Sequence, residues 1–82
     1  MRRKDFRMTS LDVVFRYATP PTEGAMRALD SVREVYGIRR MQFNSKERTL
    51  RVEFDASRLN ENTVAGLLRR AGVDVQEKLA LA

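Results

Sequence analysis

The sequence predicts a single α+β domain in which a four-stranded antiparallel sheet carries two helices on one face. Three observations lead to this prediction. Four short segments alternate apolar and polar residues, which is the two-residue period of half-buried strands. Two segments between them have apolar residues at the spacing of amphipathic helices. The chain has 82 residues, which gives room for one hydrophobic core.

The first strand is expected at residues 10–17, with a helix directly after it. The apolar positions of this strand are Leu11, Val13, Phe15 and Tyr17. Pro20 and Pro21 end the strand, because proline cannot donate to the hydrogen-bond ladder, so the helix can begin only around Pro21. We expect the helix to run to about Tyr36 and to end at Gly37 in the left-handed conformation. Its apolar stripe consists of Ala25, Leu29, Val32 and Tyr36, flanked by Met26, Ala28 and Val35.

A hairpin of two strands follows the first helix. From Ile38 the period changes to two, with Met41 and Phe43 on one face and Arg40 and Gln42 on the other. A polar turn spans residues 44–48, and such a short connection predicts antiparallel pairing. The third strand has its apolar face at Leu50, Val52 and Phe54.

The second helix has clear signals at both ends. Asn60 is a favourable N-cap, and Leu59 and Val64 occupy the two positions of a hydrophobic staple. Gly72 ends the helix as Gly37 ends the first. The predicted buried stripe is Val64, Leu67, Leu68 and Ala71, and Val73 and Val75 begin a fourth strand at the sheet edge.

The resulting order is strand, helix, strand, strand, helix, strand. Right-handed crossovers convert this order into the ferredoxin-like plan, with both helices on one face of the sheet. We assign residues 10–77 to the domain, residues 1–9 to a flexible basic tail and residues 78–82 to a short C-terminal tail. Residues 1–7 contain four basic residues and one acidic residue, a net +3 of the chain's +5.

The composition excludes several kinds of protein. The sequence contains no cysteine and no histidine, so we expect no disulfide, no thiolate or imidazole metal site and no cofactor. No apolar run approaches the roughly 20 residues of a membrane helix, and no apolar stretch follows the charged N-terminus as in a secretory signal. The cytoplasm is the expected location. No nucleophile–base pair or glycine-rich phosphate loop indicates an enzyme.

Three segments together resemble a known family. They are residues 37–43, residues 50–55 and the run Leu67-Leu68-Arg69-Arg70-Ala71-Gly72-Val73-Asp74-Val75. They are similar to the heavy-metal-associated domains of copper chaperones and metal-transporting ATPases, and the similarity covers roughly residues 10–76. The family binds metal through a Gly-Met-x-Cys-x-x-Cys loop between the first strand and the first helix. Here Pro21 and Gly24 stand where the two thiolates would be, so this metal-binding motif is degenerate.

The resemblance implies a role for this loop even without metal. In the family, the first loop and the helix surfaces dock on partner domains. The candidate docking loop consists of Thr19, Pro20, Pro21, Thr22 and Glu23. We therefore expect a non-enzymatic binding module that docks on another protein, in a metal-transport or regulatory setting. Dimerisation through the edge strands is an alternative mode of association.

Two alternatives from other functional classes stay open at this point. The first is a metal-handling protein with atypical ligands such as Met8 and Met26, although methionine on an apolar stripe is typical core filler. The second is a weak nucleic-acid-binding domain, because the RNA-recognition motif shares this topology. Its candidate basic patch is Arg39, Arg40, Arg69 and Arg70, and its stacking aromatics would be Phe15, Tyr17 and Phe54. These aromatics share the parity of the core, so nucleic acid is the less favoured partner.

Overall fold

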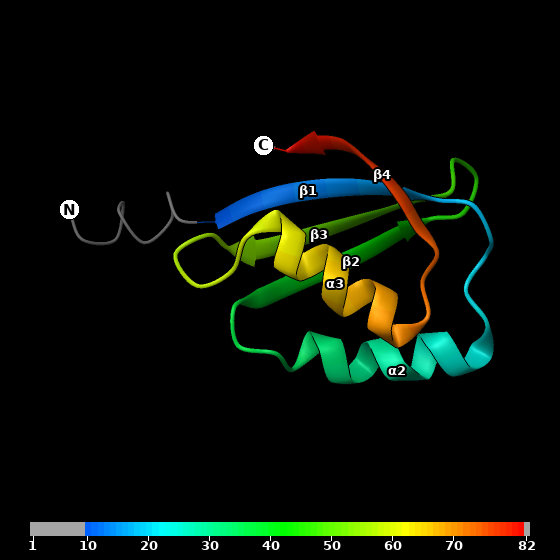
Figure 1. Cartoon of the computed structure of the whole chain (residues 1–82), viewed down its shortest axis with the longest axis horizontal. Coiled ribbons are helices and arrows are strands. Elements are labelled where there is room, and N and C mark those ends of the chain that lie inside the picture. The colour runs from blue at the N-terminus through cyan, green and yellow to red at the C-terminus, as the bar shows by residue number, and fades with distance from the viewer. Residues whose placement is uncertain (1–9, 82) are drawn as a thin grey trace.

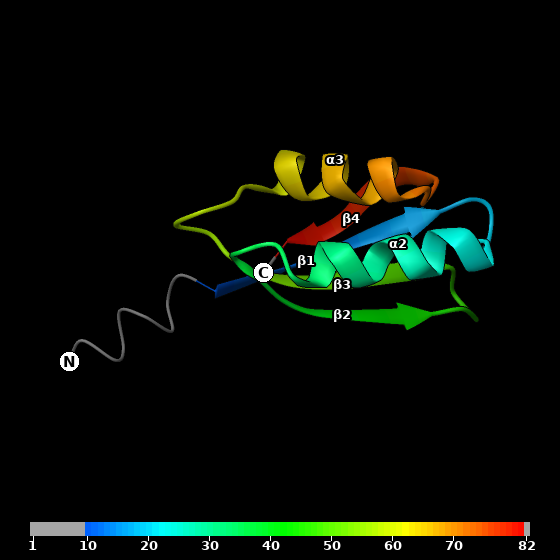
Figure 2. The same cartoon turned by 90° about the horizontal axis from the view of Figure 1, so that it is seen from below.

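The structure is a computed structural model that describes residues 10–81 (Figure 1). Its elements in chain order are β1 (Ser10–Tyr17), α2 (Glu23–Arg33), β2 (Ile38–Asn44), β3 (Thr49–Asp55), α3 (Glu61–Ala71) and β4 (Val75–Leu81). The four strands form one sheet in the order β2-β3-β1-β4, and every neighbouring pair is antiparallel. Both helices lie on the same face of the sheet (Figure 2). The predicted ferredoxin-like α+β fold is confirmed.

The core lies between the sheet and the two helices. Six of the alternating apolar residues of β1 and β3 are buried in this layer: Val13, Phe15, Tyr17, Leu50, Val52 and Phe54. Leu11, the first apolar residue of β1, is half-buried and packs against them. Leu29 of α2 and Leu68 of α3 are fully buried against them, as predicted. The stripe of α3 differs slightly from the expected one. Ala65 is buried with Val64 and Leu68, whereas Leu67 and Ala71 are only half-buried.

Helix α3 begins and ends where its capping signals predict. The Asn60 side chain accepts a hydrogen bond from the backbone amide of Thr63 at 2.8 Å, which satisfies one of the unpaired donors of the first turn. At the other end Gly72 has φ 107°, and the amide of Val73 donates to the carbonyl of Leu68 at 3.0 Å. This is the Schellman arrangement that a glycine at this position permits.

Helix α2 is shorter than predicted at both ends. It begins at Glu23, because Thr22 is its N-cap and accepts from the amide of Ala25 at 3.1 Å. It ends at Arg33 rather than at Tyr36, and residues 34–37 form a turn. Gly37 has the predicted positive φ, 106°, but within this turn. The side chain of Tyr36 is 72% exposed instead of lying on the apolar stripe, and Met26 is also exposed.

Strand β4 is longer than predicted. It continues to Leu81, so Lys78, Ala80 and Leu81 are paired with β1 and residues 78–81 do not form a tail. The charged residues Glu77 and Lys78 interrupt the apolar alternation, so the sequence pattern did not predict this part of the strand. In the structure Lys78 forms an ion pair with Glu61 at the start of α3. The predicted basic tail over residues 1–9 lies outside the described residues.

Both edge strands have irregular pairing. The register of β4 on β1 shifts at two places, and the register of β2 on β3 shifts between Ile38 and Arg40. Such bulges bend an edge and make it a poorer template for a further strand. Dimerisation through the edges is therefore not the mode of association that we propose below.

The fold predicts which positions control stability. Changing Leu29 or Leu68 to Ala should lower the free energy of unfolding by about 2–5 kcal/mol, because each change leaves a cavity in the core. The change Arg40→Ala, on an exposed position, should alter it by less than about 0.5 kcal/mol. Urea denaturation of the three variants measures the difference. Equal losses in all three would mean that the faces of the sheet are assigned wrongly.

Substitution by alanine should have opposite effects on stability at two glycines, Gly37 and Gly66. Gly37→Ala should destabilise the domain by about 1–3 kcal/mol, because φ is 106° and an added Cβ would lie 3.0 Å from Leu59 Cδ1. Gly66→Ala should stabilise it by about 0.5–1 kcal/mol, because Gly66 lies inside α3 and an added Cβ meets no atom within 4 Å. Thermal unfolding of the two variants gives the test. A tolerated Gly37→Ala would contradict the conformation of the turn.

Candidate functional site

The loop between β1 and α2 is anchored at both of its ends. At its start, the amide of Tyr17 donates to the carbonyl of Arg48 at 3.0 Å, and the amide of Ala18 donates to the carbonyl of Asp74 at 3.3 Å. The Arg48 guanidinium also donates to the Ala18 carbonyl at 3.3 Å. At its end, Thr22 caps α2. The loop is thus held by the β2–β3 hairpin, by the segment after α3 and by its own helix.

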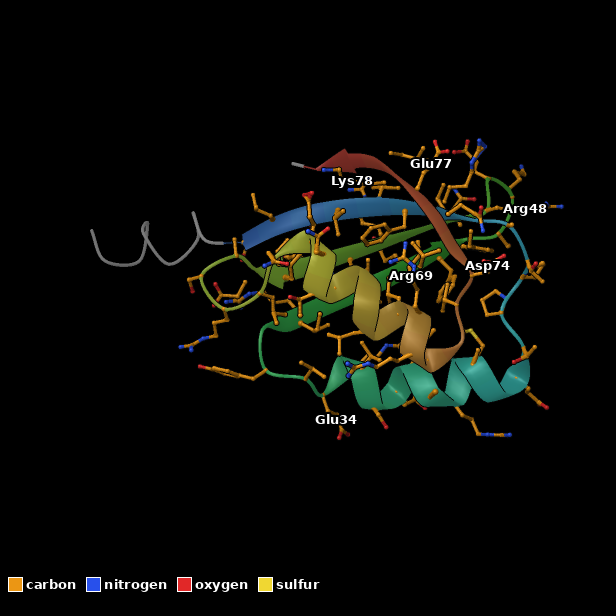
Figure 3. All side chains as sticks on the ribbon, viewed as in Figure 1. Glu34, Arg48, Arg69, Asp74, Glu77 and Lys78 are labelled. Carbon is orange, nitrogen blue, oxygen red and sulfur yellow. The ribbon has the colours of Figure 1, made fainter. Side chains whose placement is uncertain are left out.

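The hairpin that anchors this loop has a constrained tip. Asn44 accepts a hydrogen bond from the backbone amide of Glu47 at 3.2 Å, and Arg48 adopts the left-handed conformation with φ 57°. This conformation is uncommon for a residue with a side chain. In this conformation the Arg48 carbonyl accepts from the amide of Tyr17 in β1, and the Arg48 guanidinium donates to the carbonyl of Ala18 in the loop. Figure 3 places Arg48 and Asp74 at the same end of the sheet.

The side chains of the loop are exposed although its ends are fixed. Thr19, Pro20, Thr22 and Glu23 are exposed, and Pro21 is half-buried. The two prolines fix their own φ angles and so limit the conformations of the loop. The five residues of the candidate docking loop therefore form one continuous, restrained surface next to the first turn of α2.

The two degenerate motif positions lie on either side of the N-cap of α2. Pro21 precedes Thr22, and Gly24 is the second residue of the helix. A Cβ added to Gly24 would find only Thr22 Oγ1, at 3.8 Å, so a side chain fits there. Within residues 10–81, no group of three or more acidic side chains is placed to hold a metal ion. Met26 is exposed on α2, while Met8 lies outside the described residues.

The two arginine pairs do not form one patch. Arg39 and Arg40 are exposed on β2, at one edge of the sheet, whereas Arg69 and Arg70 are exposed in the last turn of α3. The arginines of the two pairs line different clefts: Arg39 lies in one, Arg69 in a second and Arg70 in a third. The candidate basic patch predicted from the sequence is therefore divided over separate surfaces.

The open face of the sheet lacks the aromatic residues that the RNA-recognition motif uses. Phe15, Tyr17 and Phe54 are buried on the helix side, as their parity predicts. Tyr17 packs edge-on against Phe43, with 5.8 Å between ring centroids. The open face carries charged residues instead, including Arg51 and Asp12 at 3.5 Å. Their separation and exposure are typical of a solvated surface pair.

One polar cluster was missed by the sequence analysis. Asp55, at the end of β3, is buried, and its Oδ1 accepts from the amide and hydroxyl of Ser57 at 3.0 and 2.7 Å. Its Oδ2 lies 3.7 Å from both Arg39 Nη2 and Arg58 Nε. The Arg58 guanidinium lies 4.2 Å from the ring centroid of Tyr36. The spacing of Asp55 and Ser57 could have indicated a local turn, but nothing in the sequence connects Asp55 to Arg39.

No helix within residues 10–81 is long and apolar enough to cross a membrane. No family model matches the sequence, and no match was found among curated proteins or among solved structures.

Proposed function

We propose that this chain is a non-enzymatic docking module whose first loop, residues 19–23, binds another protein. The observation that carries the proposal is that this loop is exposed and yet held at both ends. Tyr17 and Ala18 connect its start to two other segments, and Thr22 connects its end to α2. The resemblance to heavy-metal-associated domains, in which the same loop docks on partners, favours this assignment.

Restraint of the loop favours binding for an entropic reason. A flexible loop loses conformational freedom when a partner orders it, and this loss reduces the affinity. Here the prolines and the anchoring hydrogen bonds have already removed much of that freedom during folding. The exposed side chains of Thr19 and Glu23 are then free to provide specific polar contacts.

The degenerate motif is consistent with docking without metal transfer. Soft ions such as Cu(I) need thiolate or thioether ligands, and neither motif position provides one. The loop lies between β1 and α2, the position of the metal-binding loop in the family that the chain resembles, but it contains Pro20 and Pro21 instead of metal ligands. We propose that such a module contributes regulation or assembly in a metal-transport-type system.

The docking proposal predicts a selective loss of binding. The variant Thr19→Ala/Glu23→Ala removes a hydroxyl and a carboxylate from the loop and leaves the Thr22 cap in place. The variant Ser45→Ala/Glu47→Ala removes the same two groups from the exposed hairpin tip. Quantitative affinity capture should find a protein that the loop variant loses and the hairpin variant retains. A partner profile that does not distinguish the two variants would contradict docking through the loop.

A second prediction tests the resemblance at the motif positions. The variant Pro21→Cys/Gly24→Cys should bind one equivalent of Cu(I), because a helix N-terminus lowers the thiol pKa and favours the thiolate. The control Arg27→Cys/Asp30→Cys has the same spacing and net charge, on exposed positions in the middle of the same helix. Competition with a chromophoric chelator should give weaker binding for the control and no one-to-one binding for the unmodified chain. Equal affinities of the two variants would remove the support for the alignment.

A further inference from the structure

A second candidate surface lies at the opposite end of the sheet from the first loop. Asp55 pairs with Ser10 at the start of β1, whereas Tyr17 at the end of β1 precedes the loop. Around Asp55, the turn after α2 and the connection after β3 enclose a cleft of about 400 Å³. It is lined by Arg33, Glu34, Val35, Tyr36, Gly37, Ile38, Arg39, Asp55 and Arg58. Figure 3 places Glu34 at this end, away from Arg48 and Asp74.

The charges that line this cleft are mainly positive toward solvent. Asp55 is buried, and Oδ2 of this single carboxylate is shared by Arg39 and Arg58. Arg33 is exposed and pairs on the surface with Asp30 at 3.1 Å. Glu34 is the one exposed acidic residue of the lining. The lining therefore carries three guanidinium groups and two carboxylates, a net charge of +1, and of the two carboxylates only that of Glu34 is exposed.

The Arg58 guanidinium is held in a defined orientation. Its Nε lies 3.7 Å from Asp55 Oδ2, and its Cζ lies over the Tyr36 ring, 4.2 Å from the ring centroid. An arginine side chain has five N–H donors, and those of its two terminal amino groups suit a carboxylate in a bidentate pair. Among residues 10–81, the only partners of Arg58 are Asp55 and Tyr36. The terminal donors can thus be used without breaking an existing contact.

Tyr36 gives the cleft an apolar component. Tyr36 is 72% exposed, although its position in the helical pattern predicted burial. Tyrosine and arginine are among the residue types that most often dominate the energy of protein interfaces, since they combine a large contact area with directional hydrogen bonds. The half-buried Val35 lies beside it in the same lining. A partner with both an anionic and an apolar group fits this surface better than a free anion does.

We propose that the Arg33–Tyr36–Arg39–Arg58 cleft binds an acidic segment of a partner protein. A glutamate or aspartate of that segment pairs with Arg58, and an adjacent apolar side chain covers the Tyr36 ring. Asp55 acts as a positioning residue, because its buried carboxylate orients the guanidinium groups of Arg39 and Arg58. This surface does not depend on the first loop, so it can be tested separately from the proposed function.

The experiment uses the full chain and a labelled short peptide of alternating glutamate and leucine. Fluorescence anisotropy gives the affinity, and the shifts of backbone amide signals in NMR spectra give the location. We expect shifts at residues 33–39 and 55–58. Arg58→Ala should weaken binding about tenfold or more, since a charged hydrogen bond is lost. Arg58→Lys retains the charge beside Asp55 but not the planar group, and should also bind more weakly.

The matched control is Arg16→Ala, which removes the same charge from an exposed position on β1. At about 150 mM salt, screening should limit its effect to about twofold. Unfolding curves of each variant establish that it is folded before binding is compared. Equal weakening by Arg58→Ala and Arg16→Ala would overturn the proposal. So would equal binding of a peptide with glutamine in place of glutamate, or inorganic phosphate that produces the same shifts at lower concentration.

Discussion

Burial of one face of the two central strands is the constraint on which the rest of this structure depends. β1 and β3 each have a hydrogen-bonded neighbour strand on both edges. Their environments can therefore differ only between the face toward the helices, called the inner face, and the open face of the sheet. Their inner face consists of large apolar side chains and must be covered. The two helices provide that cover through Leu29 and Leu68, which are fully buried. The connections from β1 to β2 and from β3 to β4 must therefore both pass through a helix on this same face of the sheet.

This arrangement sorts the connections to the two ends of the sheet (Figure 1). The first loop, the hairpin tip and the segment after α3 meet at one end, where backbone hydrogen bonds join them. The turn after α2 and the connection after β3 meet at the other end, where Asp55 joins them. A rigid scaffold that positions loops is the usual basis of binding surfaces. The two ends offer different chemistry, a restrained loop and a cluster of arginines.

Local geometry, and not the total charge, decides what the basic residues of this chain can do. The net charge of +5 suggests a general attraction to anions. The fold distributes the arginines, however, over an edge strand, a helix end, a hairpin tip and the cleft around Asp55. Two of them converge only where a buried carboxylate holds them. That convergence gives two exposed arginines a common buried partner, which the other arginines of the described residues do not share.

The sequence by itself determined the features that depend on neighbouring residues. The strand alternation and the caps at Asn60 and Gly72 involve contacts within one turn or one strand, so local patterns predict them. The end of α2, the length of β4 and the Asp55 cluster depend on contacts between segments far apart in the chain. Tyr36 fits the helical period, but the turn that returns the chain to β2 begins before it. Only the pairing of β2 with β3 brings Arg39 to Asp55, and local patterns contain no record of that approach.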